Sequence, residues 1–148
     1  MAQLGQQPVL YRAFQFLVEI SGITQARFQE VGGIDATTDV MEYREGGTPL
    51  GMRKFPGQTK HSNLSLKRGF TDDTQLYKWF EDVMTGRTEN IRKEISVIQL
   101  DMNAQEKFRW NLFDAFPVKY TAPAFNAKGN DLAIESLEIA YERIERLP

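Results

Sequence analysis

The chain has 148 residues, with 18 Lys and Arg against 20 Asp and Glu, one His and no Cys. This length suits a single domain, expected to span residues 1–148, which is large enough to bury a core without disulfides. The absence of Cys excludes disulfides, thiolate metal sites and Cys nucleophiles, and a single His excludes metal sites that need several imidazoles. A formal net charge of −2 argues against general nucleic-acid binding.

No part of the sequence predicts export or membrane insertion. Residues 1–8 have neither the basic nor the apolar region of a signal peptide. No apolar run approaches the roughly 20 residues that a membrane-spanning helix needs. We therefore expect synthesis in the cytoplasm and no membrane anchor.

The first half of the chain predicts short strands. Apolar and polar residues alternate over residues 14–20, and Gly22 then allows a tight turn. The chain returns over residues 26–31, with Phe28 as the main apolar contact, so we expect a hairpin that ends at residues 32–33. The β-branched residues that follow favour an extended segment over residues 34–45.

A region rich in glycine and proline interrupts this pattern over residues 46–60. We expect no regular element there, and a loop of this length in a compact domain is usually functional or mobile. Residues 63–67 then resume as a strand, with Leu64 and Leu66 on one face.

One helix is predicted over about residues 72–85. Thr71 or Asp72 can cap its start, Gln75 completes a capping box, and Gly86 can end it. Its apolar residues recur at helical spacing and should pack against the core; they are Leu76, Trp79, Phe80 and Val83.

A second hairpin is predicted after the helix, from a strand over residues 95–100, a turn at 101–104 and a strand over 107–113. Pro117 and Pro123 are expected to interrupt the chain beyond this hairpin, before a turn at residues 126–130. Residues 133–144 fit both a helical stripe and a strand alternation, so periodicity alone leaves their structure open.

We expect no catalytic, metal-binding or cofactor-binding residues, and no enzyme activity. His61 beside Ser62 lacks an orienting third group, and we expect an exposed loop histidine. Asp72 and Asp73 lie at the predicted helix start, where carboxylates are stabilised by free backbone N–H groups. The glycine-rich residues 46–51 lack the Lys of a phosphate-binding loop.

Charge is divided unevenly along the chain. Residues 46–71 contain no acidic residue but carry Arg53, Lys54, Lys60, Lys67 and Arg68. From residue 129 onward acidic residues dominate, namely Asp131, Glu135, Glu138, Glu142 and Glu145. Three interpretations stay open: two solvated faces, complementary contacts between copies, or nucleic-acid binding on the basic region, with Phe55 and Phe70 stacking on bases.

A mainly β domain with one helix leaves sheet edges uncovered, and such edges must be blunted, closed or paired with other copies. This favours an assembly protein. The alternative from another class is a monomeric β-sandwich binding module, which would bind nucleic acid through residues 53–68.

Several segments resemble the tail tube protein family of contractile phages and of extracellular contractile injection systems, which are phage-tail-like particles. They include Glu42-Tyr-Arg-Glu-Gly-Gly47, Arg53-Lys-Phe-Pro-Gly-Gln-Thr-Lys60 and Phe116-Pro-Val-Lys-Tyr-Thr121. Residues 16–23, 28–35, 64–69 and 126–138 add to the match in the same order. Each segment is short, but their order and spacing over most of residues 14–142 are specific.

The resemblance implies a small β-barrel or sandwich with a flanking helix, and a strand for residues 133–144. It implies a hexameric ring with a continuous inner β-barrel, and rings that stack into a hollow tube. Residues 1–12 would form an N-terminal arm and residues 42–60 an extended inter-ring loop. The candidate inter-ring and inter-subunit contacts are Tyr43, Arg44, Arg53, Lys54, Pro56, Lys60, Glu138 and Glu142.

The family's tube does no bond chemistry, since sheath contraction drives it through a target envelope. The implied partners are other copies of the chain, a sheath protein, baseplate or tube-initiator and terminator proteins, and lumen cargo (an effector protein or DNA). The protein would be made in a bacterial cytoplasm and assembled into a phage virion tail or an injection particle, extracellular or cytoplasmic. Gln15, Glu19, Glu135 and Glu138 could face either the lumen or a subunit interface.

Overall fold

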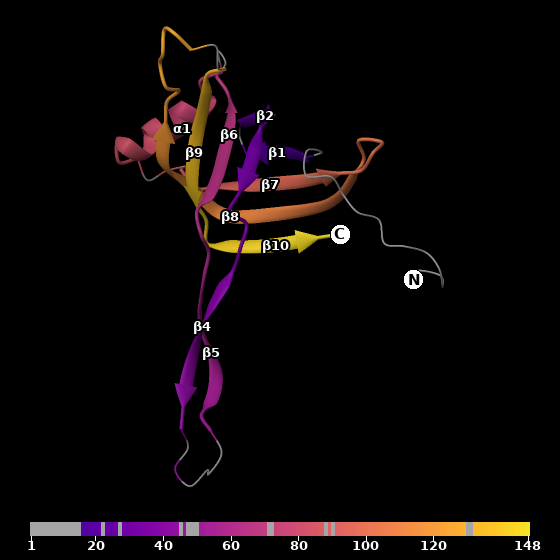
Figure 1. The fold of residues 1–148 in the computed structure, drawn as a ribbon, viewed down its shortest axis with the longest axis vertical. Helices are drawn as coiled ribbons and strands as arrows, with labels where there is room; N and C mark the ends of the chain where they lie inside the picture. Colours follow the sequence, from indigo (N-terminus) through magenta and orange to yellow (C-terminus); the bar gives the residue numbers. More distant parts are fainter. Residues whose placement is uncertain are drawn as a thin grey trace.

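The computed structural model describes residues 16–21, 23–26, 28–44, 46, 51–70, 73–87, 89, 91–129 and 132–148. These residues form ten strands and one helix, which confirms the expected mainly β fold with one principal helix. Two layers of sheet make up the body, and a narrow two-stranded arm projects from it (Figure 1). The expected N-terminal arm, residues 1–12, lies outside the described residues.

The first layer contains β2 (Ile23–Ala26), β1 (Phe16–Ile20), β7 (Lys93–Leu100), the first part of β8 (Glu106–Thr121) and β10 (Arg143–Leu147). All neighbouring strands in it are antiparallel. The predicted first hairpin is present as β1 and β2, but its returning strand ends at Ala26. The two predicted strands of the second hairpin are present as β7 and β8.

The second layer contains the last part of β8, β9 (Ile134–Ala140), β6 (Leu64–Gly69) and β3 (Glu30–Gly32). Extending the first hairpin to residue 31 was therefore wrong, because β3 pairs with β6 in this other layer. Residues 133–144 form strands, as the family resemblance implied. A helix is excluded there by the ladders of β9 with β6 and of β10 with β8.

Strand β8 belongs to both layers. Its residues up to Phe113 pair with β10, and those from Phe116 pair with β9. Between them Asp114 has φ 54°, a left-handed conformation that bends the strand. Pro117 does not interrupt β8, contrary to expectation: past Ala115 one edge of the strand has no partner among the described strands, and the register shifts beside the proline.

The core lies between the layers and contains the two leucines expected on one face of residues 63–67, Leu64 and Leu66. Alternate residues of the central strands fill it, including Val18, Ile20, Ile95, Val97, Leu112, Leu137 and Ile139. Burial of these side chains supplies most of the stabilisation, at roughly 1.5–3 kcal/mol each.

Helix α1 (Gln75–Met84) packs against β8, where Tyr77 and Phe80 contact Tyr120. Leu76 and Trp79 are buried, as the helical stripe predicted. The helix begins later than expected, and the capping box is wrong, because Gln75 is the first helical residue. The carboxylate of Asp73 accepts the N–H of Gln75 at 3.0 Å instead. The alternative caps, Thr71 and Asp72, lie outside the described residues.

Candidate assembly surface

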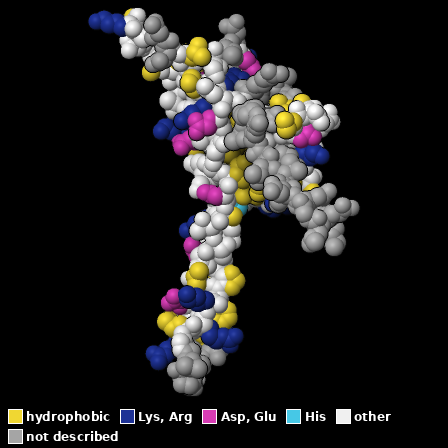
Figure 2. Space-filling view, turned by 45° about the vertical axis from the view of Figure 1, so that its right-hand side comes forward, with side chains coloured by type: hydrophobic (Ala, Val, Ile, Leu, Met, Phe, Trp, Pro, Cys, Tyr) yellow, Lys and Arg dark blue, Asp and Glu magenta, His cyan; other side chains and the backbone are white. Residues whose placement is uncertain are grey.

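The arm consists of β4 (Thr37–Tyr43) and β5 (Arg53–Lys60), paired antiparallel. The expectation that residues 46–60 lack a regular element was therefore wrong for β5. Pro56 and Gly57 are tolerated because each strand of a two-stranded ribbon keeps one edge free of ladder hydrogen bonds. Nearly all of its residues are exposed, and Figure 2 shows it as a stalk below the body.

A β-bulge bends the arm near its middle. The pairing shifts between Thr38 with Thr59 and Val40 with Pro56, so Asp39 stands opposite two residues of β5. One of these is Gly57, where an added Cβ would lie 3.1 Å from the carbonyl oxygen of Asp39. A glycine here lets the two backbones approach closely.

One face of the arm carries aromatic and apolar side chains. Met41 is paired with Phe55, and Tyr43 with Arg53. The rings of Tyr43 and Phe55 meet edge to face with centroids 6.4 Å apart, and the Arg53 guanidinium lies 5.8 Å from the Phe55 ring centroid. Met41, Tyr43 and Phe55 are nevertheless 61%, 57% and 42% exposed. Because no core lies beneath them, this apolar surface is typical of an interaction site.

The arm brings together five of the predicted contact residues: Tyr43, Arg53, Lys54, Pro56 and Lys60. Arg44 follows β4 directly. Lys60 Nζ lies 3.9 Å from the Asp39 carboxylate, which leaves both side chains more than half exposed. The arm therefore combines an apolar face with exposed cations.

The other two predicted contacts, Glu138 and Glu142, lie on the body. Glu142 accepts a hydrogen bond from Arg92 at 2.7 Å, so this carboxylate already has a partner within the chain. Glu138 lies on β9, at paired positions with Lys119 and Ser65. The structure thus separates these carboxylates from the arm.

The basic region over residues 53–68 is not one open surface. Arg68 is buried, and its guanidinium is paired with Glu135 at 2.5 Å and with Asp73 at 3.5 Å. Glu135, which the sequence left open between lumen and interface, faces neither because it is buried inside the chain. Lys67 lies 3.7 Å from Glu30.

His61 lies at the root of the arm and is half-buried, contrary to the expected exposed loop histidine. Its Nδ1 lies 2.7 Å from the carbonyl oxygen of Asp35, and its ring is 5.1 Å from that of Tyr141. The backbone N–H of Ser62 donates to the Asp35 carboxylate, a hydrogen bond that lowers the pKa of Asp35.

In the described part of the chain, two edge strands lie at opposite sides of the first layer. Among the described strands, β2 pairs only with β1 and β10 pairs only with β8. The outer backbone N–H and C=O groups of these two strands have no ladder partner among the described strands and can continue the sheet into another copy. Sequence reasoning predicted uncovered edges but not which strands form them, because strand order is a tertiary property.

The face of the first layer that points away from the core carries a polar row across four strands. Glu19, Ser96, Asn111 and Glu145 stand at paired positions on β1, β7, β8 and β10. Ser96 donates to Asn111 at 2.7 Å. Ser96 and Asn111 are buried in the middle of this row, so each side chain has its hydrogen-bond partner within the chain.

A further cluster on that face surrounds Arg109, which donates to Glu106 at 2.8 Å and to Glu19 at 3.3 Å. The hydrogen bond between Arg109 and Glu106 lowers the pKa of Glu106 and raises the pKa of Arg109. The single guanidinium is thus held between two carboxylates.

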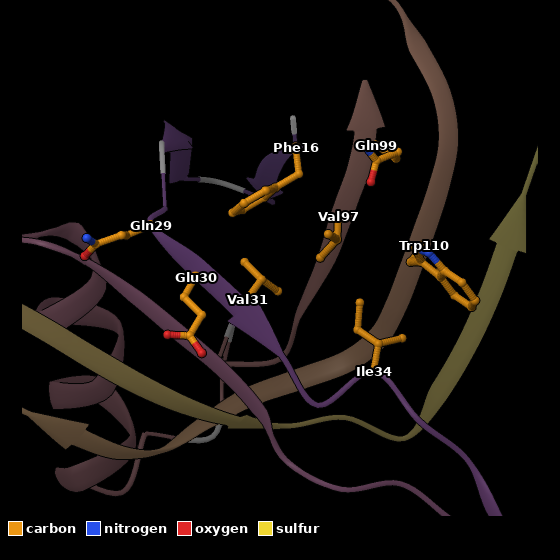
Figure 3. A pocket seen from close by; sticks show the side chains of 8 residues that line it. All are labelled: Phe16, Gln29, Glu30, Val31, Ile34, Val97, Gln99 and Trp110. Carbon is orange, nitrogen blue, oxygen red and sulfur yellow. The ribbon is translucent and has the colours of Figure 1, made fainter. Parts of the chain in front are cut away.

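An apolar hollow of about 460 Å³ opens between the layers. In Figure 3, Phe16, Val31 and Val97 project into the same space. The remaining lining residues are Gln29, Glu30, Ile34, Gln99 and Trp110. One ionisable side chain among eight suits apolar contact better than catalysis. In the described part of the chain, no three His, Asp or Glu residues are grouped to hold a metal ion, and no helix has the length and apolarity to cross a membrane.

Comparison with solved structures gives close matches over nearly the whole chain. A chain of the PVC sheath–tube complex, from an extracellular contractile injection system in the extended state, is 28% identical, with a TM-score of 0.82 over 93% of this chain and 91% of that chain. A chain of the anti-feeding prophage baseplate is 25% identical, with a TM-score of 0.83 over 95% and 97%. A chain of the anti-feeding prophage tube-terminating cap is 25% identical, with a TM-score of 0.83 over 99% of both chains.

Among curated proteins, none matches the sequence significantly. The profile of the T4-like virus tail tube protein gp19 family matches residues 12–145, which is most of the chain. This match confirms the family resemblance found in the sequence. The fold, the exposed arm and these matches together show that the chain is a structural tail tube protein and belongs to the T4-like virus tail tube protein gp19 family.

Proposed function

We propose that copies of this chain close into hexameric rings and that the rings stack into a hollow tube. The observation that carries this proposal is that β2 and β10 are, among the described strands, the edge strands on opposite sides of one layer. β10 of one copy can pair with β2 of the next copy, and every further copy can repeat this contact. A head-to-tail contact of this kind generates a ring when its rotation closes. Closure would remove every free edge of that layer.

The bulk of each copy indicates which face lines the channel. The second layer and α1 pack on the core side of the first layer. Circumference grows with radius, so the bulky side of each copy fits on the outside of a ring. The face of the first layer that points away from the core, with the exposed Glu145 and the half-buried Glu19, then lines the lumen, and Ser96 and Asn111 lie buried within this face.

Stacking is assigned to the arm. An exposed ribbon is only marginally stable on its own, and burying its apolar face against a neighbouring ring would stabilise both. The cations Arg44, Arg53 and Lys54 would then set the register with acidic surface on the neighbour, with Glu138 and Glu142 as candidates. The distribution of these contacts over a long arm suits a tube that must withstand axial force.

The partners follow from the relatives, whose structures are a sheath–tube complex, a baseplate and a tube-terminating cap. We infer that this chain likewise contacts a sheath protein, a baseplate or initiator protein and a terminator, and conducts effector protein or DNA through its lumen. Its place would be a phage tail or an injection particle assembled after synthesis in a bacterial cytoplasm. Its role is mechanical, without catalysis.

Negative-stain electron microscopy of the purified protein tests this function. Wild type should form rings or tubes with a central hole. Phe55→Glu places a charge on the apolar face of the arm and should leave rings that fail to stack, whereas Met84→Glu, an exposed methionine on α1, should stack normally. A wild-type protein that stays monomeric at high concentration, alone and with tube fragments as seeds, would refute the proposal.

The rival function is a monomeric nucleic-acid-binding module. Burial of Arg68 and the ion pair of Lys67 with Glu30 reduce the open basic surface on which it depends. A salt-dependent shift of labelled DNA by monomeric protein would favour it.

A further inference from the structure

We propose that Tyr141 is a positioning residue that fixes the direction of the arm and couples it to β10. This proposal rests on the proposed function, in which β10 closes the ring and the arm joins rings. It assigns a role to a side chain that lies far from the exposed part of the arm.

Tyr141 lies in the short gap between β9 and β10 and is 7% exposed. Its hydroxyl donates to the carbonyl oxygen of Gly33 at 2.8 Å and accepts the backbone N–H of Asp35 at 3.3 Å. One hydroxyl therefore holds the backbone on both sides of Ile34, in the segment that leads into β4. Burial of the phenol raises the pKa of Tyr141, so the hydroxyl keeps its proton at neutral pH.

The other strand of the arm reaches the same side chain through His61, which follows β5. The imidazole lies against the Tyr141 ring at 33° and 5.1 Å. Its Nδ1–H donates to the carbonyl oxygen of Asp35 at 2.7 Å, and Ser62 N–H donates to the Asp35 carboxylate at 2.8 Å. Both strands of the arm are thus joined to each other and to Tyr141.

The backbone at this root has little room to move. Gly33 has φ 96°, and an added Cβ would lie 2.2 Å from the carbonyl oxygen of Asn63. The segment entering the arm therefore lies directly against the segment leaving it. A long arm amplifies any rotation at its root, so a hydroxyl that removes this rotation controls where the far end lies.

The coupling to β10 runs through the next residue. The N–H of Glu142 donates to the carbonyl oxygen of Phe113 at 3.0 Å, and β10 begins one residue later at the pairing of Arg143 with Phe113. Edge pairing that orders β10 in a ring therefore also orders the backbone that carries Tyr141. Ring closure would thus orient the arm before rings stack.

Tyr141→Phe tests this role, because it removes the hydroxyl and keeps the ring. The matched control is Tyr77→Phe, a tyrosine on α1 whose ring contacts Tyr120. The chain has no Cys, so spin labels can be placed at Gln58→Cys on the arm and Lys119→Cys on the body. Pulsed electron spin resonance then measures the distance distribution between arm and body, in monomers and in rings diluted with unlabelled chains.

In the labelled protein without further substitutions, the distribution of distances between the two spin labels should be narrow in monomers and narrower still in rings. Tyr141→Phe should broaden the distance distribution and abolish its further narrowing in rings. It should also raise the concentration needed for stacking by about 10-fold or more, because both hydrogen bonds of the hydroxyl at the arm root are lost in every copy. Far-ultraviolet circular dichroism and ring formation should be unchanged. Tyr77→Phe should match the native background in every measurement.

Unchanged label distances and unchanged stacking in Tyr141→Phe would overturn the positioning role. Equal distributions in monomers and rings of the native background would overturn the coupling to β10. If wild type formed no rings, the proposed function would fail, while the label distances in monomers would still decide whether Tyr141 fixes the arm.

Discussion

Arg68 on β6 and Glu135 on β9 form an ion pair in the interior of the chain, with both side chains 6% exposed. The Tyr120 hydroxyl donates to the other oxygen of Glu135 at 2.8 Å, and the carbonyl oxygen of Asp73 accepts from Arg68 at 3.1 Å. This network joins β6, β8 and β9 to the segment that starts α1. It explains why two charges that the sequence suggested as surface groups are absent from the surface.

Removing one member of this pair should be strongly destabilising. Glu135→Ala leaves a buried guanidinium without its main counter-charge, which we expect to lower the free energy of unfolding by about 3–5 kcal/mol. Glu30→Ala, which removes the exposed partner of Lys67, should cost about 1 kcal/mol or less. Urea unfolding of the monomer measures both. If both substitutions lowered the free energy of unfolding equally, the buried pair would contribute no more to stability than the exposed pair.

Gly33 should tolerate no side chain. Gly33→Ala combines a left-handed backbone with a contact of 2.2 Å to the Asn63 carbonyl oxygen, so it should cost more than about 2 kcal/mol. Gly51 also has a positive φ, 66°, but nothing lies within 4 Å of an added Cβ. Gly51→Ala should therefore cost only about 1 kcal/mol. The difference between the thermal unfolding midpoints of the two variants measures the effect of the steric contact. Identical midpoints would show that the contact does not destabilise the protein.

Reversing charge on the arm should weaken stacking. Arg53→Glu with Lys54→Glu should reduce tube length at low salt while leaving the fold intact, because complementary charges set register between copies. Lys78→Glu with Lys128→Glu makes the same change of net charge elsewhere on the surface and should have little effect. Sedimentation at low and high salt measures assembly. Unchanged assembly of the arm variant under both conditions would exclude this role.

The free energy of unfolding at alkaline pH should depend on the Tyr120 hydroxyl. Burial and its hydrogen bond to Glu135 raise the pKa of Tyr120 to about 12. The unfolded chain titrates near the ordinary value of about 10, so this stabilisation is complete below pH 10 and is lost as pH rises through 12. Tyr120→Phe should show a weaker loss of stability over this range in urea unfolding. If the free energy of unfolding fell equally steeply with pH in wild type and in Tyr120→Phe, the raised pKa of Tyr120 would be contradicted.

Much of the fold was predictable because local patterns reported it correctly. Alternation identified β1, β6, β7 and the start of β8, and the apolar stripe identified α1. Predictions failed where tertiary pairing decides the outcome. β5 contains Pro56 and Gly57 and no alternation, and only its pairing with β4 makes it a strand. Residues 133–144 fit two periodicities equally, and their neighbours β6 and β8 decide between them.

The candidate assembly surface was predictable only in part. The family resemblance predicted inter-ring contacts within residues 42–60. The structure brings five of the predicted residues onto one ribbon, and their contact with a neighbouring ring stays a prediction. The sequence alone could not reveal that Arg68 and Glu135 face each other inside the chain, because strand order decides which distant residues meet. The roles proposed for Tyr141 and for the edge strands β2 and β10 also depend on strand order, so no local sequence pattern around Tyr141 could have indicated them.

The bend at Asp114 has a mechanical consequence. One uninterrupted backbone passes from the first layer into the second, so the layers share a covalent connection as well as an apolar core. Apolar contacts are non-directional and resist sliding weakly, whereas a strand hydrogen-bonded in both layers must break its ladders before they can slip. The wall of a tail tube made of such chains would resist shear through its thickness, because β8 of each copy connects the two layers covalently.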